Sequence, residues 1–136
     1  MSVVNFLNDL RGLSGPDRIM DEKIARIGGW VKREDVLVRN GKQFPSASWE
    51  LDGVVLLKLP FFTGSTDAAL LFLNRVCPHV GFGGFSWSGA GRAKAIIGDA
   101  HPEEAATPAI AICLAAIEYR LRERQLEKGA ASSPEA

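Results

Sequence analysis

The stretch AATPAIAICLAAIEYRLRERQLEK, residues 105–128, carries the strongest helical pattern in the chain. Thr107 offers a side-chain oxygen as an N-cap, and Pro108 suits the first helical position. Apolar residues then recur at the three- and four-residue spacing of one helix face. They are Ile110, Cys113, Leu114, Ile117 and Leu121, with Ala109, Ile112 and Ala116 beside them. The alanines predict close packing against a sheet, and the charged residues beyond Glu118 predict last turns that reach solvent or a partner.

Three further helices are predicted nearer the N-terminus. Residues 3–11 have apolar side chains on one side at nearly helical spacing. In the second segment Ser14 or Gly15 can cap, Pro16 suits the first position, and the glycines at 28–29 end the helix. In the third, Ser65 or Thr66 is a good N-cap and Pro78 ends an apolar run.

Residues 31–62 lose the helical period and predict strands. Asn40-Gly41 and Asp52-Gly53 are turn dipeptides, and VVLLKLP at 54–60 predicts a buried strand. We interpret the basic stretch 32–42 as a solvated hairpin edge, where charge discourages further pairing. FSWSGAGRAKAII at 85–97 predicts a second hairpin, because apolar and polar residues alternate around its glycines.

These elements predict an α+β fold in which a small, mostly antiparallel sheet is sandwiched between helices. The 136 residues predict one domain over 1–128 and a disordered tail over 129–136. Sixteen basic and sixteen acidic residues balance, which disfavours nonspecific nucleic-acid binding without excluding a local basic patch. The sequence has two cysteines, which fit a reducing compartment, and it has neither a signal-peptide pattern nor an apolar run of membrane length. These features predict a cytoplasmic protein without membrane association.

The clearest candidate for chemistry is the group Asp67, Cys77 and His79. Ten helical residues separate Asp67 from Cys77, about 15 Å, so Asp67 cannot orient a Cys77/His79 pair. Cys77 would also lie at a helix C-terminus, where the dipole raises a thiol pKa. We expect no catalytic residue, although a hydrolase or transferase using Cys77 and His79 stays open as an alternative.

Two other clusters have simpler interpretations. A zinc site from Cys77, His79, His101 and Cys113 would match none of the usual ligand spacings, so we expect no metal and no cofactor. The acidic group Asp99, Glu103 and Glu104 is interpreted as a solvated loop before a helix.

The three tryptophans are the best candidates for binding, since tryptophan occurs in cores and at binding surfaces alike. Trp49 has polar neighbours, Ser48 and Glu50, so we expect it to be the most exposed of the three. Trp49, Trp87 and Arg92 are therefore the predicted ligand- or partner-binding residues: two aromatic platforms and a fork of donors.

Three segments together resemble the phage ABA sandwich domain family, small proteins of phages and prophages. They are GPDRIMDEKIARIGGW (15–30), LPFFTGSTDAALLFL (59–73) and GRAKAIIGDAHPEEAATPAIAICLAAI (91–117), and the likeness covers about residues 14–122, loosely over 31–58. The resemblance implies helices on either side of a small sheet and carries no established activity. On physical grounds Thr63, Ser65 and Asp67 are helix-entry residues.

We therefore expect a non-enzymatic accessory protein of a phage or prophage that binds a host protein or a small ligand. Besides the Cys77/His79 enzyme, a double-stranded nucleic-acid-binding module is an alternative, which rests on Lys32, Arg33, Arg39 and Lys42. The sequence leaves open whether the chain forms a homo-oligomer.

Overall fold

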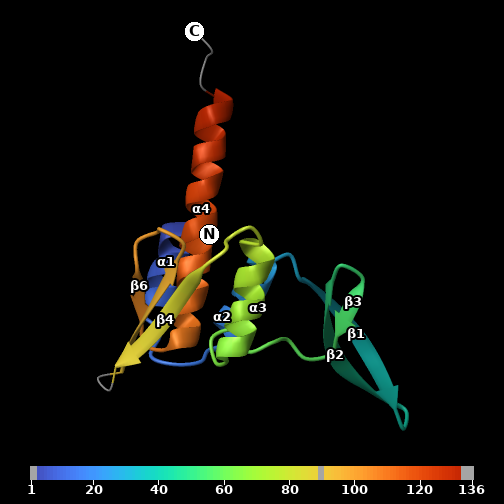
Figure 1. The fold of residues 1–136 in the computed structure, drawn as a ribbon. Coiled ribbons are helices and arrows are strands. Elements are labelled where there is room, and N and C mark those ends of the chain that lie inside the picture. The colour runs from blue at the N-terminus through green and yellow to red at the C-terminus, as the bar shows by residue number, and fades with distance from the viewer. Residues whose placement is uncertain (1–2, 89–90, 133–136) are drawn as a thin grey trace.

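The computed structural model describes residues 3–88 and 91–132, which form helices and two small antiparallel sheets (Figure 1). The elements in chain order are α1 (Val3–Arg11), α2 (Arg18–Ile27), β1 (Val31–Arg39), β2 (Lys42–Leu51), β3 (Val54–Leu56), α3 (Thr66–Val76), β4 (Gly83–Ser88), β5 (Arg92–Ile97), β6 (Glu103–Ala105) and α4 (Pro108–Ser132). Sheet A has the order β1-β2-β3 and sheet B the order β4-β5-β6. The α+β class is thereby confirmed.

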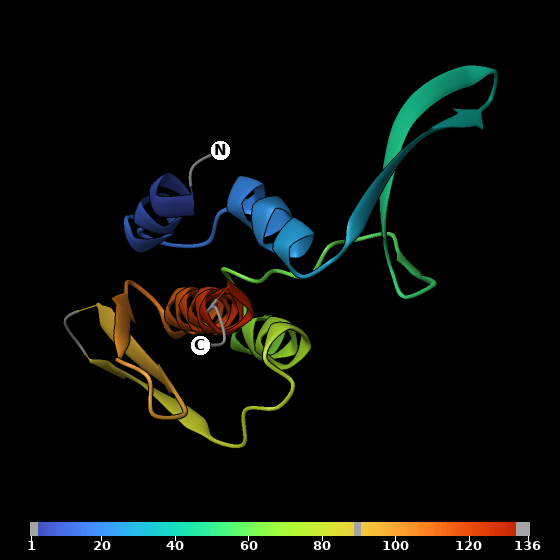
Figure 2. The same cartoon turned by 90° about the horizontal axis from the view of Figure 1, so that it is seen from above.

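Helix α4 is the centre of the structure. Residues 109–117 are all buried, so its first turns are covered on every side rather than along one stripe. Helices α1 and α3 and all three strands of sheet B contact it. Viewed along its axis, sheet B lies on one side of α4 and α1 and α2 lie on the other (Figure 2). The predicted cap is confirmed, since the Ile110 N–H donates to Thr107 Oγ1 at 3.3 Å.

The layering differs from the single sheet between helices that we expected. In β5 buried and exposed residues alternate: Ala93, Ala95 and Ile97 are buried, whereas Arg92, Lys94 and Ile96 are exposed. Sheet B is therefore covered by α4 on one face and exposed on the other. Small alanine side chains on β5 and on α4 allow the close approach that the sequence predicted.

Sheet A forms an arm that projects from the helices (Figures 1 and 2). Both predicted turns are confirmed as two-residue loops in the left-handed region, with φ of 51° and 74° at Asn40 and Gly41 and 51° and 84° at Asp52 and Gly53. These values are typical of type I′ hairpin turns. The predicted buried strand at 54–60 was wrong, because β3 ends at Leu56 and Val54 is 61% exposed.

The ends of two helices also differ from expectation. Asp17 rather than Ser14 or Gly15 caps α2, since its carboxylate accepts the Met20 N–H at 2.8 Å. Helix α4 continues through Ser132, past the end that we expected at Lys128, and residues 133–136 of the expected tail lie outside the described residues. Ser65 is the cap of α3, as predicted.

A buried polar network joins the start of α2 to the segment before α3. The Asp21 carboxylate, 1% exposed, accepts the backbone N–H and the hydroxyl of Thr63 at 2.8 and 2.7 Å. It also accepts a bond from Arg18 at 2.8 Å. Thr63 Oγ1 accepts the Asp17 N–H, also at 2.8 Å. Thr63 is therefore a fully buried connector rather than the helix-entry residue that we expected.

This network predicts that Asp21→Ala destabilises the fold strongly. Removing the carboxylate leaves the buried Thr63 N–H without its acceptor, and it takes one acceptor each from the Thr63 hydroxyl and the half-exposed Arg18 guanidinium, at a cost of about 2–3 kcal/mol. Urea denaturation measures the free energy of unfolding. Asp67→Ala is the matched control, since Asp67 is an exposed acidic residue in the first turn of α3 and its loss costs under about 1 kcal/mol. Equal losses in the two variants would contradict the network's role.

Candidate functional site

A groove of about 860 Å³ lies between the four helices. Its basic side chains are Lys23, Arg26, Arg75, His79, Arg120 and Arg124, and its main apolar ones are Val3, Phe6, Ile27, Val76, Ile117 and Leu121. None of the described residues that line it is acidic. We call it the basic groove.

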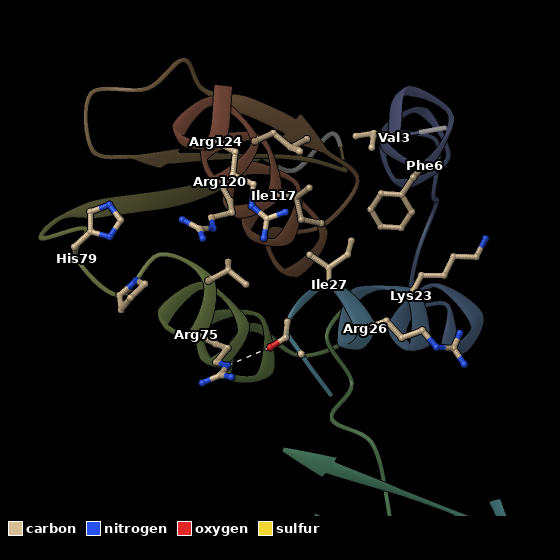
Figure 3. Close-up of a pocket in the computed structure, with 15 residues that line it drawn as sticks. Val3, Phe6, Lys23, Arg26, Ile27, Arg75, His79, Ile117, Arg120 and Arg124 are labelled. Carbon is tan, nitrogen blue, oxygen red and sulfur yellow. Dashed lines mark hydrogen bonds between the residues drawn. The ribbon is translucent and has the colours of Figure 1, made fainter. Parts of the chain in front are cut away.

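Helical spacing places these residues on facing surfaces. In α4, Ile117, Arg120, Leu121 and Arg124 follow the i, i+3, i+4, i+7 pattern of one helix face. Lys23, Arg26 and Ile27 of α2 follow the same spacing over one turn. Figure 3 shows Phe6, Ile27 and Ile117 near the middle of the groove, with Arg120 and Arg124 to one side and Arg75 across from them on α3.

The cations of the groove differ in how they are held. Arg75 donates to the Gly28 carbonyl at 3.1 Å and to the Asp52 carboxylate at 2.9 and 3.3 Å, which fixes its guanidinium. The Arg26 guanidinium lies 5.7 Å from the Trp49 ring centroid. Lys23 and Arg124 have no ion-pair partner within the part of the chain that the structure describes. An anion in the groove would therefore meet cations that are not already neutralised.

Glu123 lies beside the groove and pairs with two of its basic residues. Its carboxylate is 2.5 Å from His79 Nε2 and 3.9 Å from an Arg120 nitrogen. Nothing near His79 in the sequence indicates this partner, because the two residues come from different elements. The carboxylate compensates part of the positive charge and holds the His79 ring toward α4.

Cys77 and His79 do not form the pair that a cysteine hydrolase needs. The Cys77 thiol is 3% exposed and donates to the Ala116 carbonyl at 3.6 Å, whereas His79 is exposed and engages Glu123. Burial first, and then the Glu123 carboxylate, raises the pKa of Cys77 to about 11. Both effects disfavour the thiolate, so they count against the Cys77/His79 alternative.

The expected exposure of the tryptophans was wrong for Trp49. Trp49 is 4% exposed and lies at the base of the arm near α2, while Trp87 is 73% exposed on the edge strand β4. Arg92 is exposed on β5 and pairs in register with Ser88. Trp49 therefore belongs to the core. Trp87 and Arg92 lie on neighbouring strands of sheet B, away from the basic groove, and their side chains project from opposite faces because Trp87 pairs with Ala93 and Arg92 with Ser88.

The other clusters that we considered are also dispersed. Cys113 is fully buried and donates to the Phe62 carbonyl at 3.5 Å, while His101 is exposed in a loop. Glu103 and Glu104 belong to β6 rather than to the predicted solvated loop. Burial of Glu103, with Glu118 nearby, raises the pKa of its carboxyl, and Arg11 opposes this rise.

The basic residues behind the nucleic-acid alternative lie on the arm. Lys32 pairs with Glu22 at 3.1 Å and Arg33 pairs with Glu50, while Arg39 and Lys42 are exposed at the hairpin end. Half of this basic set is therefore engaged by carboxylates of the same chain. The alternative stays a prediction.

Comparisons with family models, with curated proteins and with solved structures find no match for this chain. Over residues 3–88 and 91–132, no helix combines the length and apolar character of a membrane span.

The raised pKa predicts that Cys77 is unreactive in the native protein. In a Cys113→Ala background at pH 8, about one thiol in a thousand is ionised if the pKa is about 11, so iodoacetamide reacts far more slowly than with the unfolded chain. The rate should rise about tenfold per pH unit up to pH 9.5 or so without a plateau. Mass spectrometry measures the modified fraction, and a plateau near pH 7 would restore the enzyme alternative.

Proposed function

We propose that this protein is a non-catalytic binding protein whose basic groove holds an amphipathic organic anion. The single observation that carries the proposal is the concentration of cations around an apolar floor in a chain whose total charge is zero. A phosphate or carboxylate group would lie among the arginines, and an apolar body would cover Phe6, Ile27 and Ile117.

The size and lining of the groove support a small ligand. Its volume of about 860 Å³ lies within the range of known small-molecule sites, roughly 300–1,000 Å³. Such sites combine an apolar lining with a few polar groups that fix orientation. Arg75 is fixed by its bonds to Gly28 and Asp52, so it presents its guanidinium at little further entropic cost on binding.

The described residues that line the basic groove include no cysteine, serine, threonine or carboxylate, which favours binding over chemistry. The imidazole of His79, which also lines the groove, is engaged by the Glu123 carboxylate. The resemblance to the phage ABA sandwich family supports a setting as an accessory protein of a phage or prophage in the bacterial cytoplasm. In that setting we propose that the protein sequesters its ligand.

The proposal predicts that dodecyl phosphate binds and that neither half of it binds alone. Isothermal titration calorimetry should give a Kd of about 1–100 μM for dodecyl phosphate and no measurable heat with inorganic phosphate or decanol. Lys23→Glu and Arg124→Glu should each weaken binding about tenfold or more, since each reverses a charge that has no ion-pair partner among the described residues. The affinity should also fall with added salt.

The matched control is Arg92→Glu, which makes the same change of charge on sheet B, outside the groove. Its affinity should equal that of the unaltered protein. An equal loss in all three variants, or binding of inorganic phosphate as tight as that of dodecyl phosphate, would contradict a site in this groove. Preference for an acidic amphipathic peptide over dodecyl phosphate would make the ligand a partner protein instead.

A further inference from the structure

Strand β1 is an open edge on the projecting arm. It lies at the end of sheet A and has β2 as its one hydrogen-bonded neighbour among the described strands. The arm extends away from the helices (Figure 2), and apolar side chains along it are exposed, among them Val31 at 59% and Leu37 at 54%. A two-stranded ribbon of this kind is marginally stable by itself, so further pairing would stabilise it.

The hairpin register identifies the backbone groups that face outward. Arg39 and Lys42 flank a two-residue turn and so exchange hydrogen bonds with each other, which directs the odd-numbered residues of β1 toward β2. The N–H and C=O groups of Lys32, Glu34 and Val36 therefore face the open edge. Consistent with this, the Val36 N–H is accepted by the Asp35 carboxylate at 2.8 Å rather than by β2.

The side chains of β1 form a self-complementary series. Val31, Arg33, Asp35 and Leu37 share one face, in the order apolar, positive, negative, apolar. When an antiparallel second copy is related by a twofold axis through Glu34, residue 34−n of one chain lies opposite residue 34+n of the other. Arg33 then lies opposite Asp35 and Val31 opposite Leu37, twice each. Such directly opposed pairs are the stabilising unit of a sheet.

The neighbouring registers are less complementary than this one. An axis through Arg33 brings Lys32 opposite Glu34 twice, but it also places two arginines opposite each other and Val31 opposite Asp35. An axis through Asp35 opposes two carboxylates and places Arg33 opposite Leu37. Charges on an edge strand ordinarily prevent pairing, and here the register through Glu34 is the one that matches both the charged and the apolar residues of one face. The favoured register has one cost, because it places the two Glu34 carboxylates opposite each other. The Lys32 ammonium of the same chain lies 3.9 Å from each Glu34 and compensates part of this repulsion.

We propose that this protein forms a twofold-symmetric dimer through antiparallel pairing of β1 with β1 of a second copy, with Glu34 on the axis. The outward N–H and C=O groups of Glu34 bond to those of Glu34 in the second copy. Val36 pairs with Lys32 of the second copy, which releases Asp35 from the Val36 N–H so that it meets Arg33. The surface is separate from the basic groove, so neither proposal depends on the other.

Charge reversal on β1 tests the proposal. Sedimentation velocity from about 1 μM to about 1 mM should show a reversible dimer of the full chain. Arg33→Asp and Asp35→Arg should each raise the dissociation constant about tenfold or more, because each places like charges opposite each other at two points. An equimolar mixture of the two variants should dimerise again, since an acidic β1 then faces a basic one.

The mixture of the two variants distinguishes a contact between two chains from a contact within one chain. Arg33 also pairs with Glu50 of its own chain, and mixing two altered chains cannot restore that bond. Glu34→Gln should strengthen the dimer, because it removes the opposed carboxylates, and circular dichroism checks that each variant is folded. A wild-type chain that stays monomeric at about 1 mM, or a mixture that stays as dissociated as its components, would overturn the proposal.

Discussion

The burial of α4 on all sides is the constraint on which the rest of the structure depends. A helix with apolar residues around its whole circumference must be covered all round. In this chain α1, α3 and sheet B provide that cover over residues 109–117. The alanines of α4 meet small residues of sheet B, Ala93, Ala95 and Ala105, each at most 2% exposed. Bulkier side chains on either side would hold the sheet away from the helix.

The basic groove arises where this cover ends. Beyond Ile117 the helix extends out of the core, and its apolar face gives way to one that also carries Arg120 and Arg124. The surrounding helices supply apolar residues beside cations in the same way. The groove is thus the rim of the core, and the same periodicity that builds the core places its arginines next to apolar surface.

The polar interactions have a different part, because they set which segments meet. Asp21 and Thr63 lie far apart in the sequence, and their buried bonds attach α2 to the segment that leads into α3. Arg75 likewise joins α3 to the end of α2 and to the second turn of the arm. Asp21 and Thr63 would be costly to bury without these bonds, so their contacts form together with the packing around them.

The sequence by itself determined the local structure: the helices, the Ser65 and Thr107 caps, the Asn40-Gly41 and Asp52-Gly53 turns and the central place of 105–128. Each depends on side chains within about four residues of the backbone that they affect. Only the tertiary structure decided that Trp49 is buried and Trp87 exposed, that Thr63 bonds to Asp21, and that Glu123 faces His79. The polar neighbours of Trp49 could not reveal its burial, since alternate residues of a strand face opposite sides. The tertiary structure also brings the cations of α2, α3 and α4 together in one groove. Patterns within one segment could not show this, because proximity depends on segments that are distant in the chain.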